Sequence, residues 1–251
     1  MNSQTQAADT EKRLPILGHL AELRTRLTRS VIVVFVTTVL SFIFYHKIFD
    51  ILMYPAGNTK FIAIEMTEMI GVIFRVCLIS GVIVAIPYLT YEFIMFVAPA
   101  LTPKEKRYVF VVIPWIALMF AGGVVFGYFV LLPPAMKFLL NFGGDIATIQ
   151  PRIGNYINVV TRLLLAIGLV FEMPVVSTFL ARLGVVSGKW LAGKRKWAII
   201  IAFVVAAIIT PTFDPVNQTL VAVPLIILYE LSIWLAYALG KKKKPATAEA
   251  V

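Results

Sequence analysis

Charged residues are scarce in this chain. Asp, Glu, Lys and Arg make up 14% of its 251 residues, whereas hydrophobic residues make up 60%. A soluble domain needs many more charged side chains on its surface, so this composition excludes one. Several apolar runs approach or exceed the length of about 20 residues that a helix needs to cross a bilayer. The composition therefore predicts an all-α polytopic membrane protein with no separate soluble domain.

Signatures of catalysis and of metal binding are also lacking. The sequence contains no GxxxxGK[ST], HExxH or GxSxG motif. Its two histidines, His19 and His46, fall on opposite sides of the predicted membrane, and its single cysteine, Cys77, can form no intrachain disulfide. There is no nucleic-acid-binding motif either. We therefore expect no enzymatic activity, no metal, no cofactor and no nucleic-acid partner.

Six apolar segments alternate with polar links. They are predicted at about Ser30–Tyr45, Glu68–Pro99, Tyr108–Leu132, Tyr156–Leu183, Trp197–Pro211 and Gln218–Leu239. The fifth has only 15 residues, which is about 22 Å of helix against a bilayer core of about 30 Å. The six segments form one membrane domain over residues 14–240. A disordered N-terminal tail (1–13) and a basic, then polar, C-terminal tail (241–251) flank it.

Further details of these segments are predicted from periodicity, prolines and length. Leucines at three- and four-residue spacing from Leu17 indicate an amphipathic helix on the membrane surface that leads into the first span. Pro133 and Pro134 are predicted to end the third span. The second span is too long to stand upright in a bilayer, so it is predicted to tilt, to kink at Pro87 or to project beyond the surface.

The basic residues predict the orientation. With the N-terminus inside the cell, the inner segments hold 17 of the 23 Lys and Arg residues and the outer links hold 4. Positive charge concentrates on the cytoplasmic side of membrane proteins. Both termini are therefore predicted to be cytoplasmic.

One carboxylate lies inside an apolar run of membrane length. Glu172 falls within Leu163–Phe179, and Pro174 follows it by two residues. An ionised side chain at the bilayer centre costs at least roughly 2.5–3.5 kcal/mol, and the proline leaves a carbonyl without its helical donor. The position predicts an intramembrane polar site that meets a partner helix or water. The alternative is a structural glutamate that is hydrogen-bonded inside the bundle.

Four segments carry a resemblance to a known family. They are HLAELRTRL (His19–Leu27), FVAPALTPKEKR (Phe96–Arg107), GLVFEMPV (Gly168–Val175) and ITPTFDPVNQT (Ile209–Thr219). In this order, on six spans with both ends cytoplasmic, they resemble the TatC family of the twin-arginine translocase. The resemblance covers residues 14–240.

This resemblance implies a fold, a function and partners. It implies a cupped bundle whose concave face displays the membrane glutamate, in a bacterial plasma membrane. The subunit would bind the Arg-Arg signal peptides of folded substrates. With TatA- and TatB-type single-span subunits, in a hetero-oligomer of several copies, it would export those substrates using the proton-motive force.

The resemblance also assigns roles to individual residues. Glu22 and Glu105 match the family's acids implicated in recognising the arginine pair, and Arg24 and Phe96 match supporting positions on the same face. Glu172 matches the membrane glutamate. The implied docking cluster for partner helices contains Thr210, Asp214 and Gln218.

The chain also departs from the family pattern. Residues 64–68 lack a proline usual in the first outer link, so the geometry of the outer cap is open. Thr212-Phe213 replaces a tighter Pro-Pro pair, so the register before Asp214 is open too.

Simpler interpretations of these residues stay open. Glu22 has the i,i+4 spacing to pair with Arg26, Asp214 is placed to cap the last helix, and Arg24 and Phe96 have topology and packing roles available. A proton-coupled small-molecule transporter that uses Glu172 and Glu92 is the rival function. The absence of an internal repeat counts against it.

Overall fold

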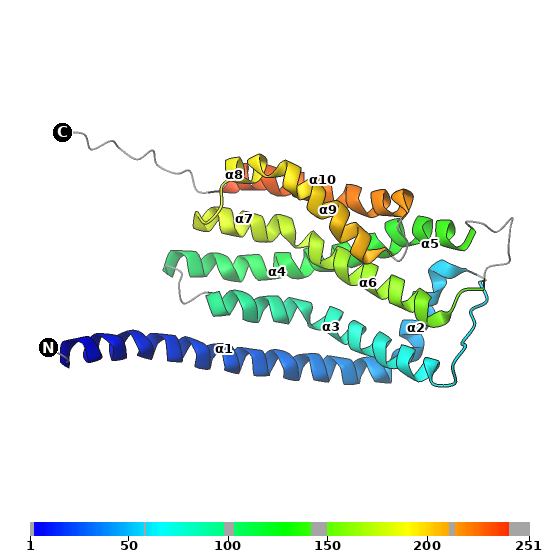
Figure 1. Cartoon of the computed structure of the whole chain (residues 1–251), viewed down its shortest axis with the longest axis horizontal. Coiled ribbons are helices and arrows are strands. Elements are labelled where there is room, and N and C mark those ends of the chain that lie inside the picture. The colour runs from blue at the N-terminus through cyan, green and yellow to red at the C-terminus, as the bar shows by residue number, and fades with distance from the viewer. Residues whose placement is uncertain (1–2, 58, 98–102, 142–149, 211–213, 241–251) are drawn as a thin grey trace.

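The protein is built from helices that run side by side as an elongated bundle (Figure 1). A computed structural model describes residues 3–57, 59–97, 103–141, 150–210 and 214–240, with side chains from residue 18 onward except 97, 103–111 and 140. The first turn of α1 (Ser3–Ile43) and the last turn of α10 (Pro215–Leu239) lie at the same end of the bundle. The other elements, in chain order, are α2 (Tyr45–Met53), the 3-10 turn η1 (Tyr54–Ala56), α3 (Glu68–Val97), α4 (Pro103–Phe126), the π-helical turn η3 (Gly127–Leu131), α5 (Leu132–Asn141), α6 (Ile153–Phe171), α7 (Met173–Leu183), α8 (Gly188–Gly193) and α9 (Arg195–Ile209).

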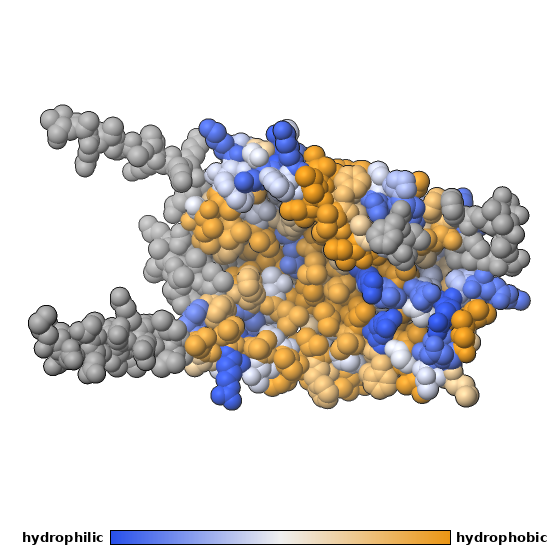
Figure 2. All heavy atoms as spheres, viewed as in Figure 1, coloured by the Kyte–Doolittle hydropathy of each residue, from blue (hydrophilic) through white to orange (hydrophobic). Residues whose placement is uncertain are grey.

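Five helical segments in the described ranges are long and apolar enough to cross a membrane. They are Gly18–Ile43, Glu68–Phe96, Val112–Leu139, Ile153–Leu183 and Pro215–Leu239. Each overlaps a predicted span. The remaining predicted span corresponds to α9, a helix of 15 residues. Figure 2 shows a hydrophobic belt across the middle of the visible face, with hydrophilic residues toward the two ends.

Helix α1 is longer than the sequence pattern predicts. It is one element of 41 residues that begins at Ser3. It therefore covers most of the segment 1–13, for which a disordered tail is predicted, and it joins the predicted surface helix to the first span without a break. The Ala, Gln, Glu and Lys residues near its start are good helix formers, which explains the extension.

The prediction that Pro133 and Pro134 end the third span is wrong. Helix α4 continues through η3 into α5, which ends at Asn141. The two prolines lie in the first turn of α5, where a missing N–H is tolerated. The π-helical turn before them shifts the pairing, since the N–H of Leu132 bonds the carbonyl of Gly127. Pro87 likewise lies inside the continuous helix α3.

Arg152 holds together the end of the bundle opposite the first turn of α1. Its guanidinium donates to Glu68 at 3.1 and 3.3 Å and to Glu65 at 3.2 Å. A backbone bridge pairs Ile62 with the same residue. Glu68 and Glu65 raise the pKa of Arg152 above its ordinary value, so it stays charged. An ion pair therefore orders the link before α3 although residues 64–68 lack the family's proline.

Glycines allow α4 and α6 to pack closely. A Cβ built on Gly123 would lie 2.7 Å from the Phe171 side chain, and one built on Gly168 would lie 2.6 Å from the Phe120 ring. Gly122, the neighbour of Gly123, has nothing within 4 Å of such a Cβ. The close helix contact is therefore made at Gly123 and not at Gly122.

This asymmetry gives a test of the packing. Gly123→Ala should lower the thermal unfolding temperature, because overpacking a close contact costs about 1–3 kcal/mol. Gly122→Ala is the matched control and should leave the temperature unchanged or raise it, since Ala favours helix over Gly. Equal effects of the two substitutions on unfolding in detergent would contradict the assigned contact.

Candidate functional site

Four polar side chains form a cluster between α1 and α3, named here the α1–α3 polar cluster: Glu22, Arg26, Tyr88 and Glu92. The Arg26 guanidinium donates from Nε (3.0 Å) and Nη2 (2.7 Å) to Oε1 of Glu22. Its Nη1 donates to Oε2 of Glu92 at 2.8 Å. The Tyr88 hydroxyl donates to Oε1 of Glu92 at 2.7 Å. One guanidinium therefore joins two carboxylates from different helices.

Burial differs across this cluster. The side chain of Glu92 is 4% exposed and that of Arg26 is 17% exposed, whereas that of Glu22 is 30% exposed. A buried carboxylate is stable only when a cation and hydrogen bonds compensate its lost hydration. Arg26 and Tyr88 supply both to Glu92. Glu22 is the member of the cluster that a ligand from solution reaches most easily.

Two rings lie beside Glu22. His19 stacks on Phe96 with centroids 4.2 Å apart and an interplanar angle of 16°. Nδ1 of His19 lies 3.8 Å from Oε2 of Glu22. Two of the predicted recognition residues, Glu22 and Phe96, are thereby brought to one place.

The other two predicted recognition residues stand differently. Arg24 is exposed, and within the described part of the chain no side-chain hydrogen bond or ion pair joins it to the cluster. The backbone of Glu105 lies in the first turn of α4, but its side chain is outside the described residues. The pairing of Glu22 with Glu105 around an arginine pair therefore stays a prediction.

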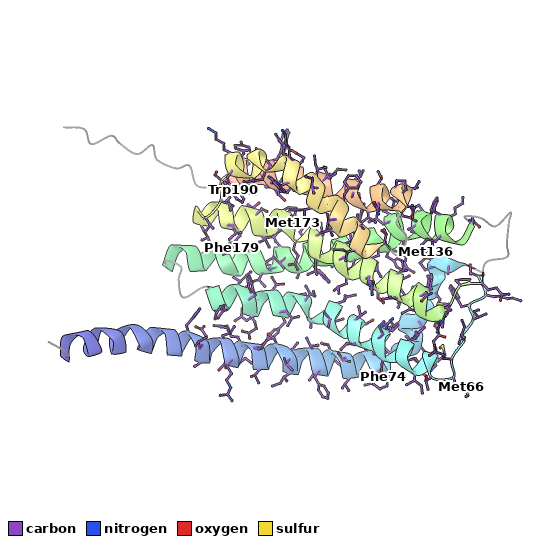
Figure 3. The ribbon with its side chains drawn as sticks, viewed as in Figure 1. Met66, Phe74, Met136, Met173, Phe179 and Trp190 are labelled. Carbon is purple, nitrogen blue, oxygen red and sulfur yellow. The ribbon has the colours of Figure 1, made fainter. Side chains whose placement is uncertain are left out.

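Glu172 lies at the break between α6 and α7. The N–H of Glu172 bonds the carbonyl of Leu169 at 3.1 Å, and α7 begins at the next residue, with Pro174 in its first turn. This break lies two residues before Pro174, whose missing N–H is predicted to leave a helix carbonyl without its donor. Met173, the residue after Glu172, lies in the central part of the bundle (Figure 3).

The Glu172 side chain is buried, with 8% of the residue exposed. Thr90 of α3 lies near it, and the Thr90 hydroxyl donates to the carbonyl of Ile86 at 2.9 Å. Its Oε1 atom has no hydrogen-bond partner in the part of the chain that the structure describes. A buried polar atom left unpaired costs about 1–3 kcal/mol. The intramembrane polar site and the structural glutamate therefore both stay predictions.

The break between α9 and α10 holds the third predicted site. Asp214 caps α10 by accepting from the Asn217 N–H at 2.7 Å and from its Nδ2 at 3.1 Å, so the capping role is confirmed. Thr210 ends α9 and donates to the carbonyl of Ala206, and Gln218 is half-buried. The Thr212-Phe213 departure lies outside the described residues.

Sequence reasoning missed the role of Glu92. Sequence reasoning places Glu92 only in the rival transporter, whereas the structure shows it buried and paired with Arg26, 66 positions away. The i,i+4 spacing of Tyr88 and Glu92 was the available signal. Because Glu92 is already compensated, the structure gives no support to its role in a proton relay. No group of three or more metal-ligating side chains occurs among the described residues.

Comparisons with known proteins agree with this geometry. The profile of the family described as "Sec-independent protein translocase protein (TatC)" matches residues 18–224. A protein of that name from Desulforapulum autotrophicum is 43% identical over 96% of this chain and 90% of the relative. Another, from Aquifex aeolicus, is 38% identical over 92% of this chain and 98% of the relative.

Solved structures show the same likeness. A crystal structure described as the twin-arginine translocase receptor TatC has a TM-score of 0.78 and 38% identity, covering 87% of this chain and 97% of the other. A second, in the detergent DDM, has a TM-score of 0.81 and 39% identity, covering 89% and 100%. Together with apolar helices of membrane length, these likenesses show that the chain belongs to the TatC family of Sec-independent protein translocases.

Proposed function

We propose that this chain is the receptor subunit of a twin-arginine translocase in a bacterial plasma membrane. It binds the twin-arginine signal peptides of folded substrates at the end of the bundle that carries Glu22 and Glu105. With TatA- and TatB-type single-span partners, in a hetero-oligomeric complex, it exports those substrates using the proton-motive force. The family assignment does not favour the small-molecule transporter.

The observation that carries the proposal is the way Glu22 holds a guanidinium. Its Oε1 atom accepts two N–H groups of Arg26, at 3.0 and 2.7 Å. A guanidinium presents parallel N–H groups that an ammonium cannot reproduce. The partly exposed Glu22 thus already binds one arginine side chain, that of Arg26. The His19–Phe96 stack next to it offers a flat surface on which an arginine side chain can lie.

The depth of α9 supports a sixth span. Arg195, at its first residue, donates to Glu230 of α10 at 2.7 and 2.9 Å, and α9 ends at Ile209, five residues before the N-cap of α10. Helix α9 therefore runs back along the first 16 residues of α10. At 1.5 Å per residue this is about 24 Å of depth, short of a bilayer core of about 30 Å. Bilayer thinning beside α9 accommodates the difference.

Two further sites serve export in this proposal. Glu172 presents an unpaired buried oxygen to a polar side chain of a partner helix or to a water file. The segment around Thr210, Asp214 and Gln218 docks a partner helix. Its hydrogen-bonded cap on α10 keeps the end of that helix in place.

The direct test is the affinity of the purified chain for signal peptides. Glu22→Gln should weaken an Arg-Arg peptide about five- to tenfold, since a partly exposed charge-assisted pair contributes about 1–1.5 kcal/mol. It should also reduce the ratio of the affinity for the Arg-Arg peptide to the affinity for a Lys-Lys peptide. Combining it with Glu105→Gln should weaken the Arg-Arg peptide further.

Glu230→Gln is the matched control for this experiment. Glu230 is also a partly exposed carboxylate held by an arginine, with a side chain 38% exposed, and it plays no part in the proposed recognition. Its substitution should leave both affinities unchanged. Unaltered discrimination in the Glu22→Gln, Glu105→Gln double variant would show that the arginines are recognised elsewhere.

A further inference from the structure

Glu22 is not vacant in the chain without a peptide. Both of the shortest contacts at its Oε1 atom come from Arg26, one helical turn away. The other oxygen, Oε2, faces Nδ1 of His19 at the longer distance of 3.8 Å. A substrate guanidinium that is to use both carboxylate oxygens must therefore take Oε1 from Arg26.

We propose that Arg26 is an internal competitor for the substrate arginine. It occupies Glu22 while no peptide is bound, and it transfers fully to Glu92 when a peptide guanidinium takes Glu22. Arg26 thereby sets the affinity of the recognition site. This inference rests on the proposed function, because it needs Glu22 to bind the peptide.

Glu92 makes such an exchange inexpensive. Nη1 of Arg26 is already 2.8 Å from Oε2 of Glu92, and Tyr88 holds the other oxygen of that carboxylate in place. Releasing Glu22 therefore leaves the Arg26 charge compensated by a carboxylate that is itself 4% exposed. Neither charge is left buried and unpaired at any stage, which is the condition under which a buried pair becomes costly.

The same contacts would also suit a purely positioning role, in which Arg26 holds Glu22 ready for the peptide. The two roles predict opposite changes in peptide affinity when Arg26 is removed. A competitor lowers peptide affinity, so removing it tightens binding. A positioning residue raises affinity, so removing it weakens binding.

The decisive variant is Arg26→Gln with Glu92→Gln. Arg26→Gln alone would leave Glu92 buried without its cation and would risk misfolding, whereas the double change removes both charges and keeps amides that hydrogen-bond. We expect the Arg-Arg peptide to bind about two- to tenfold more tightly, the range spanned by a helical Glu–Arg pair and a shielded one. Adding Glu22→Gln should abolish this gain.

Glu92→Gln alone should act in the opposite direction. Arg26 then loses its second carboxylate and stays on Glu22, so the peptide should bind more weakly than to the unaltered chain. The matched control removes another ion pair, by Arg195→Gln with Glu230→Gln, and should change neither affinity.

The outcomes distinguish the competitor role of Arg26 from the proposed recognition of the peptide by Glu22. Weaker or unchanged binding by the Arg26→Gln, Glu92→Gln variant, while Glu22→Gln still weakens binding, would overturn the competitor and leave the proposed function intact. If Glu22→Gln has no effect on the Arg-Arg peptide, the proposed recognition site itself is wrong. Circular dichroism and thermal unfolding of each variant establish that the compared proteins are folded.

Discussion

Replacing Glu172 by leucine should stop export and yet leave the isolated chain as stable as before, or more so. The carboxyl is buried, and its Oε1 atom has no hydrogen-bond partner among the described residues. Leucine removes the cost of that unpaired oxygen, which is about 1–3 kcal/mol. Export should fall about tenfold or more, because a polar partner helix or water file loses a contact of about 1.5–3 kcal/mol.

The measurements are export of a folded reporter and thermal unfolding of the purified chain. Glu172→Gln keeps a hydrogen-bonding group and should retain more export than Glu172→Leu. Met173→Leu, an apolar change at the adjacent exposed position, is the control and should export normally. If leucine at position 172 supports export as well as glutamate does, the residue has only a structural role.

Glu172→Leu is expected to preserve or raise stability and to lower export, and such opposite effects are typical of a functional site. A chain selected only for stability would not keep a buried carboxyl oxygen unpaired at this depth. The sequence places Pro174 two residues after Glu172, but it does not predict the break between α6 and α7. Thr90 of α3, which lies near Glu172, is 82 positions away, and no local pattern connects the two.

The acidic residues show which ion pairs and caps can be predicted from sequence spacing and which cannot. Two pairings follow from spacing alone: Glu22 with Arg26 at i,i+4, and the Asp214 cap at the start of α10. Glu92 and Glu230 pair with Arg26 and Arg195, which lie 66 and 35 positions away. Long side chains near helix ends can extend to the surface or find a partner, and only the packing of the helices decides between these outcomes.

The prolines show the same limit. Pro174 lies in the first turn of α7, Pro87 lies inside α3, and Pro133 and Pro134 lie in the first turn of α5. The missing N–H is common to all of them. The effect of a missing N–H on the helix depends on which group bonds the freed carbonyl. The π-helical turn η3, which precedes Pro133 and Pro134 and keeps the helix continuous, has no sequence signature. The helical segments themselves were predictable, because their length and apolarity do not depend on packing.

The orientation of the chain should show an all-or-none pattern of chemical labelling. Inner segments are predicted to hold 17 of the 23 basic residues, and the first turn of α1 and the last of α10 share one end of the bundle (Figure 1). In a Cys77→Ser background, cysteine at the exposed position Lys60 should react with an impermeant thiol reagent in intact cells. Cysteine at Lys189 in α8 should react only after the membrane is broken.

A third cysteine, at Val216, tests whether the short helix α9 crosses the membrane. Val216 is the second residue of α10 and is 54% exposed. If α9 spans, this position lies outside and reacts in intact cells like position 60. If α9 turns back within the inner leaflet, position 216 is protected and the basic residues 241–244 are placed outside, against the charge asymmetry that orients membrane helices. Protection of position 216 together with reaction at position 60 would therefore reduce the spans to five. Reaction at both, with none at position 189, is the result that six spans and two cytoplasmic termini require.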